Sequence, residues 1–171
     1  MARLGLPYLT EGMWNAVLII AIVSSACVGG VLFAFSAFVM PALGHTPPAE
    51  AIRAMQSINV FAQRAPFGIV ILVSAAASIA LAARQISDWQ GLGSVLVLVG
   101  AGVYLVVGFG LSGAVNIPLN NGLAIAVPTA ADAASIWQAY THPWEVANHL
   151  RAASGLVAAA AFSASAILRS A

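Results

Sequence analysis

Long runs of apolar residues, separated by shorter polar segments, dominate the chain. A helix needs about 20 mostly apolar residues to cross the roughly 30 Å hydrocarbon core of a bilayer. The first three runs carry no charge. The fourth, 156–168, is short, so we expect its helix to begin near Pro143. The pattern therefore predicts four transmembrane helices, at about 14–40, 66–83, 92–115 and 143–168.

Two long polar segments join these helices, and each carries the start signals of a short amphipathic helix. In the first, Pro47 and Pro48 follow a threonine and precede Glu50, which predicts a helix over 47–63. In the second, a threonine stands three residues before Asp132, which predicts a helix over 130–140. Pro118 is expected to end the third transmembrane helix.

An even number of crossings fixes the expected topology. Both termini and the short connection 84–91 fall on one face of the membrane, and both long segments fall on the other. We therefore expect an all-α, four-transmembrane-helix bundle that forms a single integral membrane domain over 1–171. Short amphipathic helices lie in the two long loops on one membrane face.

The composition agrees with a membrane protein and excludes several function classes. Apolar residues make up 61% of the 171 residues and charged residues only 6%, against about 25% charged residues in soluble domains. The net charge is +1 and the arginines are scattered, so no nucleic-acid partner is expected. Three arginines fall on each side, and the charge rule favours neither orientation. Nothing in the pattern specifies an oligomeric state.

Small residues recur at spacings that favour close helix packing. Ala26, Gly30 and Ala34 lie four apart in the first span, and Gly100 and Gly108 lie in the third. Small side chains let membrane helices approach closely. We expect these positions to face neighbouring helices.

Polar residues gather at one predicted level of the bundle. Polar side chains are costly near a membrane, so they are candidates for function. They come from three distant parts of the chain that the topology places on one face. The members of this layer are Met55, Gln56, Asn59, Asn116, Asn120, Asn121, Trp144, Asn148, His149 and Arg151.

The start of the fourth helix places some of these residues on one stripe. At 100° per residue, Trp144, Asn148, Arg151 and Gly155 fall within about 60° of one another. An aromatic plane, an amide, a guanidinium and a glycine form the wall of a recess for a flat ligand with negative charge on oxygen. Glu145 and His149 form an adjacent stripe four residues apart.

Simpler interpretations of the same residues stay open. Trp144 is typical of a membrane-interface aromatic, and Arg151 alone typically extends to the headgroups. Glu145 and His149 are typical of a pair that supports a helix. The amide of Asn116 or Asn120 can satisfy backbone groups beside a proline.

Metal, hydrolase and transport chemistry find little support in the sequence. His45, His142 and His149 form no close ligand pair, so no metal site is predicted. No serine or cysteine has an evident base partner. The four apolar runs contain no carboxylate, which disfavours a proton pump or an ion-coupled transporter.

The order and spacing of four motifs resemble those of a known family. The motifs are FVMPAL at 38–43, MQSIN at 55–59, NIPLN at 116–120, and Trp144 followed by NHLR at 148–151. Over nearly the whole chain, this pattern resembles the anthrone oxygenase-like family of small four-helix membrane proteins.

The resemblance implies oxidation of an anthrone-like aromatic polyketide to a quinone without a cofactor. The expected partners are a small aromatic or lipophilic substrate, dioxygen and the lipid bilayer. On this interpretation His149 removes a proton, since a histidine has an unperturbed pKa of about 6.5. The other expected roles are orientation of the base by Glu145, donation to oxygen by Asn148, Asn116 and Asn120, charge stabilisation by Arg151, ring stacking by Trp144, and substrate binding by Asn59, Gln56 and Met55.

A function without catalysis is the alternative. In that case the polar layer fixes helix ends, and the protein binds a lipid, a quinone or a partner subunit. A bound aromatic compound would favour the oxygenase, and a stoichiometric protein partner would favour the non-enzymatic membrane module.

Overall fold

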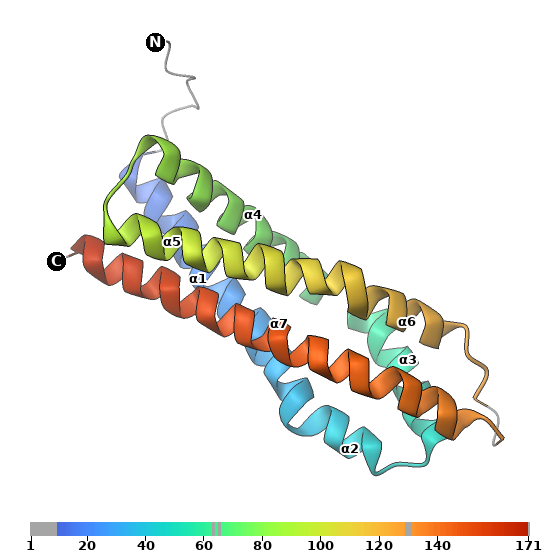
Figure 1. Ribbon diagram of the computed structural model, residues 1–171. Helices are drawn as coiled ribbons and strands as arrows, with labels where there is room; N and C mark the ends of the chain where they lie inside the picture. Colours follow the sequence, from blue (N-terminus) through green and yellow to red (C-terminus); the bar gives the residue numbers. More distant parts are fainter. Residues whose placement is uncertain (1–9, 63, 65, 129–130, 171) are drawn as a thin grey trace.

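The part of the chain that the structure describes is helical and contains no strand. The structure is a computed structural model, and it describes residues 10–62, 64, 66–128 and 131–170. Four helices in it are long and apolar enough to cross a membrane, which fits an integral membrane protein. The predicted all-α bundle is confirmed (Figure 1).

The four long helices are interrupted or extended in ways that matter for the site. The first is α1 (Glu11–Ala34), which continues through a π-helical turn, η1 (Phe35–Val39), into α2 (Met40–Gly44). The second is α4 (Phe67–Ser87). The third comprises α5 (Leu92–Gly102), the π-helical η2 (Val103–Phe109) and η3 (Ser112–Asn116), and α6 (Ile117–Ala124). The fourth is α7 (Ala133–Ser170).

The first predicted amphipathic helix is present, and the second is not a separate element. Helix α3 (Pro48–Ala62) corresponds to the helix expected over 47–63; residue 63 lies outside the described residues. Residue 130 of the helix expected over 130–140 lies outside the described residues, and from Ala133 onward this segment is the first part of α7. Pro143 lies inside that helix rather than at its start. Aromatic contacts on both sides of Pro143 hold the helix together, since Tyr140 packs against Trp137 at 5.7 Å and against Trp144 at 6.2 Å between ring centroids.

Pro118 also fails to end its helix, contrary to the prediction. It lies in the first turn of α6, directly after the π-helical η3. A proline is tolerated in a first helical turn because the missing N–H has no partner there. The π-helical stretch therefore lets the third long helix continue to Ala124.

Two apolar cores lie one beyond the other along the bundle. The larger one joins α1, α4, α5 and α7 and contains Leu32, Tyr104 and Phe162. The smaller one joins α2, α3, α6 and the start of α7, and it contains Met55, Tyr140 and Trp144. In Figure 1, α2, α3 and α6 surround the beginning of α7. At 1.5 Å per residue, the 37 residues of the α7 span extend about 55 Å, well beyond a bilayer core of about 30 Å.

The closest helix contact joins α1 to α7 through two glycines. A Cβ on Gly155 would lie 2.8 Å from the Cα of Gly29, and a Cβ on Gly29 would lie 2.8 Å from a backbone nitrogen of α7. The predicted stripe that includes Gly30 is therefore wrong by one residue, since a Cβ on Gly30 would have no neighbour within 4 Å. The expectation for Gly100 and Gly108 is confirmed, because added side-chain atoms there would meet α7 at 2.9 and 2.7 Å.

An ionic cluster closes the end of the bundle where α1 begins and α4 ends. Arg84 donates at 2.7 Å to both Glu11 and Asp88, and its guanidinium lies over the ring of Trp14. Burial by itself would raise the pKa of Asp88, but hydrogen bonds from Gln90 and Arg84 and the arginine charges outweigh it and lower that pKa. The end of α7 lies at this same end (Figure 1), whereas residues 1–9 and 171 lie outside the described residues.

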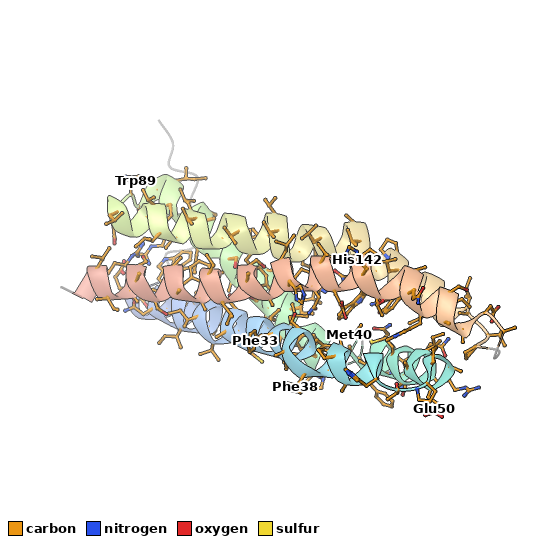
Figure 2. The ribbon with its side chains drawn as sticks, turned by 60° about the horizontal axis from the view of Figure 1, so that its bottom comes forward. Phe33, Phe38, Met40, Glu50, Trp89 and His142 are labelled. Atoms are coloured by element: carbon orange, nitrogen blue, oxygen red, sulfur yellow. The ribbon has the colours of Figure 1, made fainter. Side chains whose placement is uncertain are left out.

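The outer surface of the bundle is rich in apolar side chains. Phe33 and Phe38 on the first long helix are 56% and 63% exposed, whereas Met40 is buried. Figure 2 shows Trp89 at one end of the bundle, and Glu50 and His142 toward the other. An exposed apolar surface of this kind suits contact with lipid.

Candidate functional site

A cavity of about 290 Å³ lies where the two cores meet. Its size is close to the lower end of the roughly 300–1,000 Å³ that is typical of small-molecule sites. The wall is largely apolar, with aromatic rings from four helices and a few polar groups. The lining residues used below are Phe35, Met55, Asn59, Phe67, Phe109, Ser112, Asn116, Asn120, Trp144 and Arg151.

The three π-helical stretches all border this cavity. Phe35 comes from η1, Phe109 from η2, and Ser112 and Asn116 from η3. A π-helical turn contains one more residue than an α-helical turn, and such turns are common at functional sites. Here the wider turns direct side chains from the first and third long helices toward the same space.

Arg151 is the one charged residue among those that line the cavity. No carboxylate in the described part of the chain forms an ion pair with it, and its buried Nε has no hydrogen-bond partner there. A buried charge without a partner is costly. The guanidinium is therefore suited to a ligand that brings negative charge or acceptor oxygens.

The orientation of the Asn120 amide is fixed by two donors. The indole Nε1 of Trp144 and the hydroxyl of Tyr140 each donate to Asn120 Oδ1 at 2.9 Å. An indole N–H can only donate, so the oxygen of the amide must face Trp144 and Tyr140. The NH₂ group of Asn120 is consequently left as a donor.

Three further predicted residues reach the cavity wall. Met55 is fully buried in the smaller core. Asn116 donates to the backbone oxygen of Trp144 at 3.2 Å, and its own Oδ1 makes no hydrogen bond with described residues. Nδ2 of Asn59 likewise makes no hydrogen bond within the described chain. The structure therefore brings Met55, Asn59 and Asn116 together with Asn120, Trp144 and Arg151.

Asn148 and His149 lie beside the cavity rather than in its wall. Asn148 is completely buried and donates to Leu32 O at 2.8 Å and to Ser36 Oγ at 2.9 Å. Nδ1 of His149 lies 2.6 Å from the same Ser36 oxygen, and the imidazole is exposed on the outside of the bundle. These two residues form a network with Ser36 behind Leu32 and Phe35, which line the cavity.

Gln56 and Glu145 do not line the cavity. The amide of Gln56 donates to Leu123 O at 2.8 Å and Ala126 O at 2.9 Å, so it holds the C-terminal end of α6. Glu145 is half-buried on α7, and the Nδ1 partner of His149 is Ser36 instead. Among the described residues, no three metal-ligating side chains come together.

Sequence analysis missed several residues of the site. Tyr140 orients Asn120, and it was detectable because it lies four residues before Trp144 on the same helical face. Ser36 was a lone hydroxyl within an apolar run, with no signal in its spacing. Phe35, Phe67 and Phe109 could not be separated from lipid-facing aromatics by sequence alone.

The site as a whole offers a largely apolar space with hydrogen-bond donors in its wall. A guanidinium and the NH₂ group of Asn120 both require acceptor oxygens in a ligand. Rings such as Trp144 and Phe35, whose centroids are 5.9 Å apart, favour an aromatic ligand. The arrangement can bind a planar phenol or ketone and stabilise it as an anion.

Comparison with known proteins gave a family match. The model of the family described as anthrone oxygenase matches residues 55–161. This match extends from α3 into α7 and contains both Met55 and Arg151. Comparisons with curated proteins and with solved structures gave no match.

Proposed function

The chain belongs to the anthrone oxygenase family, and on this premise we propose that its cavity binds an anthrone-like aromatic ketone and oxidises it to a quinone. The observation that carries the proposal is the guanidinium of Arg151, which has no carboxylate partner among the described residues and lies in a largely apolar, aromatic-lined cavity. An anthrone becomes an enolate when its methylene group loses a proton. Arg151 is suited to hold that negative charge on oxygen.

The proposed reaction balances without a further co-reactant. The methylene carbon loses a proton, and the resulting enolate transfers electrons to dioxygen and forms a carbon–oxygen bond to it. The peroxide then loses water as the second C–H bond and the O–O bond break. One oxygen atom becomes the new carbonyl and the other leaves as water, so the carbon is oxidised and dioxygen is reduced. The substrate-derived carbanion supplies the electrons.

The proposed roles of the polar residues fall at two positions along α7. Arg151 and Trp144 are seven residues apart, which places their Cα atoms about 10 Å apart along the helix axis. We assign the charge-stabilising role to Arg151. Asn120, oriented by Trp144, donates to a second oxygen of the ligand, with Asn59 and Asn116 beside it. Trp144 and Met55 contact the ring system.

His149 remains the proposed proton acceptor, and its surroundings define how it would act. Ser36 occupies Nδ1, so Nε2 is the nitrogen left to receive a proton. The ring lies outside the cavity wall, so direct transfer requires it to leave Ser36. Asn148 also binds Ser36, and its proposed contribution is to position that hydroxyl rather than to touch the ligand.

A membrane location suits both reactants. A second hollow of about 350 Å³ adjoins the cavity and shares Phe35, Ile58 and Phe67 with it. Its lining is almost wholly apolar, which supports entry of a lipophilic substrate from the bilayer. We further propose that the start of α1 and the end of α7 lie on one side of the membrane, with α3 and α6 on the other.

Purified protein in lipid, mixed with an anthrone under air, tests the proposal. We expect one dioxygen consumed per quinone formed, and one labelled oxygen atom in the quinone when the gas is ¹⁸O₂. The matched control is Arg151→Met. Tight binding of the anthrone without oxygen consumption above that control would contradict the oxygenase and leave the quinone-binding alternative.

A further inference from the structure

A small chamber lies on the side of Arg151 that faces the larger core. Its volume is about 10 Å³, and it shares five lining residues with the ligand cavity: Leu32, Ile71, Phe109, Ser112 and Arg151. Its polar side chains are Tyr104, Ser112, Arg151 and Ser154.

The three hydroxyl groups around the chamber already use their hydrogens. Tyr104 donates to Ile71 O at 3.2 Å, Ser112 to Gly108 O at 2.8 Å, and Ser154 to Arg151 O at 2.7 Å. A hydroxyl has one hydrogen and two lone pairs. Each of these groups therefore offers the chamber an acceptor and no donor.

Arg151 supplies a hydrogen-bond donor. Its Nε is buried and makes no hydrogen bond with the described residues. An N–H group left in this condition destabilises the fold, and more so when it is charged. One donor and several acceptors around a space of this size match the needs of a single small molecule that both accepts and donates.

We propose that this chamber is a binding site for one water molecule, which fixes the guanidinium of Arg151 in the ligand cavity. A cavity of about 10–15 Å³ holds one water when two to four polar partners surround it. The water accepts from Arg151 Nε and donates to two of the hydroxyl oxygens. An anion would meet only lone pairs at those hydroxyls, so the site selects water over a small anion.

With this water bound, the guanidinium of Arg151 forms hydrogen bonds in the chamber and can form others in the ligand cavity. In this proposal Nε donates to the water, and the two terminal nitrogens remain for a ligand in the cavity. Arg151 thus acts on the ligand, while the water, held by the hydroxyl groups of the chamber, positions it. This consequence for ligands depends on the proposed function, whereas the water site itself does not.

The Gly108→Ala variant fills the chamber without touching the ligand cavity. A Cβ there would lie 2.7 Å from Ser154 Oγ and 3.9 Å from the ring of Tyr104. The matched control is Gly102→Ala on the same long helix, because a Cβ there has no neighbour within 4 Å. Tyr104→Phe removes one hydrogen-bond acceptor from the chamber while keeping the aromatic ring. It is the second test variant if Gly108→Ala does not fold.

Nuclear magnetic resonance of arginine side chains tests the site directly. The chain has six basic residues, all arginine, so ¹⁵N-arginine labelling gives a simple Nε–H spectrum, and Arg151→Lys assigns the signal. We expect a cross-peak between Arg151 Nε–H and water in the wild type and in Gly102→Ala. It should be lost in Gly108→Ala and weakened in Tyr104→Phe. A wild-type signal without a water contact, or one unchanged by both chamber variants, would overturn the proposal.

Ligand binding provides the second measurement. A hydroxyanthraquinone and its methyl ether serve as an ionisable probe and a neutral probe. We expect Gly108→Ala to weaken binding of the ionised probe by roughly tenfold, which corresponds to one charged hydrogen bond, and to leave the ether unaffected. Equal effects on both probes would contradict the positioning role. Failure of the wild type to bind either probe would count against the proposed function. It would not affect the proposed water site, which the cross-peak between Arg151 Nε–H and water tests separately.

Discussion

The indole nitrogen of Trp144 donates a hydrogen bond to Asn120 Oδ1 over 2.9 Å. This contact joins the third and fourth long helices at the edge of the cavity, and the hydroxyl of Tyr140 adds a second donor to the same oxygen. The NH₂ group of Asn120 is therefore the part of the amide that a ligand can use. The relationship explains how a single asparagine both holds two helices and recognises an oxygen atom.

Substitution of Asn120 separates these two tasks. Asn120→Asp keeps an acceptor for Trp144 and Tyr140 but loses the donor, whereas Asn120→Leu loses both. We expect the aspartate variant to lose less thermal stability than Asn120→Leu and to bind a hydroxyanthraquinone at least about tenfold less tightly. The leucine variant should also lose stability, because two buried donors are left unpaired. Equal ligand affinity in Asn120→Asp and wild type would contradict the assignment.

The glycine contact between α1 and α7 predicts a sharp difference between neighbouring residues. Gly155→Ala places a Cβ 2.8 Å from the Cα of Gly29, where only backbone can move. We expect a loss of about 1–3 kcal/mol in the free energy of unfolding, as for overpacked cores. Gly30→Ala is the control, since a Cβ at Gly30 meets nothing within 4 Å. Circular dichroism during unfolding in mixed detergent measures the free energy of unfolding. Equal losses in Gly155→Ala and Gly30→Ala would contradict the close contact between Gly29 and Gly155.

Sequence reasoning succeeded where helical periodicity fixed the result. It identified the apolar runs, and it placed Trp144, Asn148 and Arg151 on a face that the structure finds directed inward. It was wrong at Pro143 and Pro118. The prediction considered only the local cost of a proline inside a helix, whereas aromatic packing near Pro143 and π-helical turns before Pro118 offset that cost. It also chose Gly30 over Gly29, since a shift of one residue rotates a helical face by about 100°.

The inner surface of the cavity was only partly predictable. Six of the ten predicted site residues line it, because topology brings their helices to one end. The positions of Gln56 and His149 depend on partners distant in sequence, namely the C-terminal end of α6 and the hydroxyl of Ser36. Such pairs become apparent only when the helices are packed.

The ionic cluster at Arg84 predicts an acid-dependent loss of stability. The pKa of Asp88 lies below its ordinary value of 3.8 in the folded protein. The stabilising effect is therefore complete above that value and is lost as the pH falls through the lower folded-state pKa. Thermal unfolding between about pH 5 and pH 3 should show a steeper decline for wild type than for Asp88→Asn. Parallel curves for the two proteins would rule out this contribution.

His149→Ala tests the predicted base. We expect this variant to fold and to lose turnover, because the imidazole would no longer accept the methylene proton. Ser36→Ala frees Nδ1 and should change kcat without abolishing turnover. Steady-state oxidation of an anthrone over a range of pH provides the measurement. Full activity of His149→Ala would remove the imidazole from the mechanism and leave Arg151 as the main catalytic group.

Oxygen consumption by wild type and Arg151→Met, measured side by side with an anthrone, tests the central claim most directly. The account predicts that the methionine variant loses about 10²–10³-fold in kcat, the effect of removing an oxyanion-stabilising group. Its thermal stability should be equal to or higher than that of wild type, because an apolar side chain replaces an unpaired buried charge. Retention of wild-type turnover by Arg151→Met would contradict the claim that this guanidinium stabilises the anionic substrate.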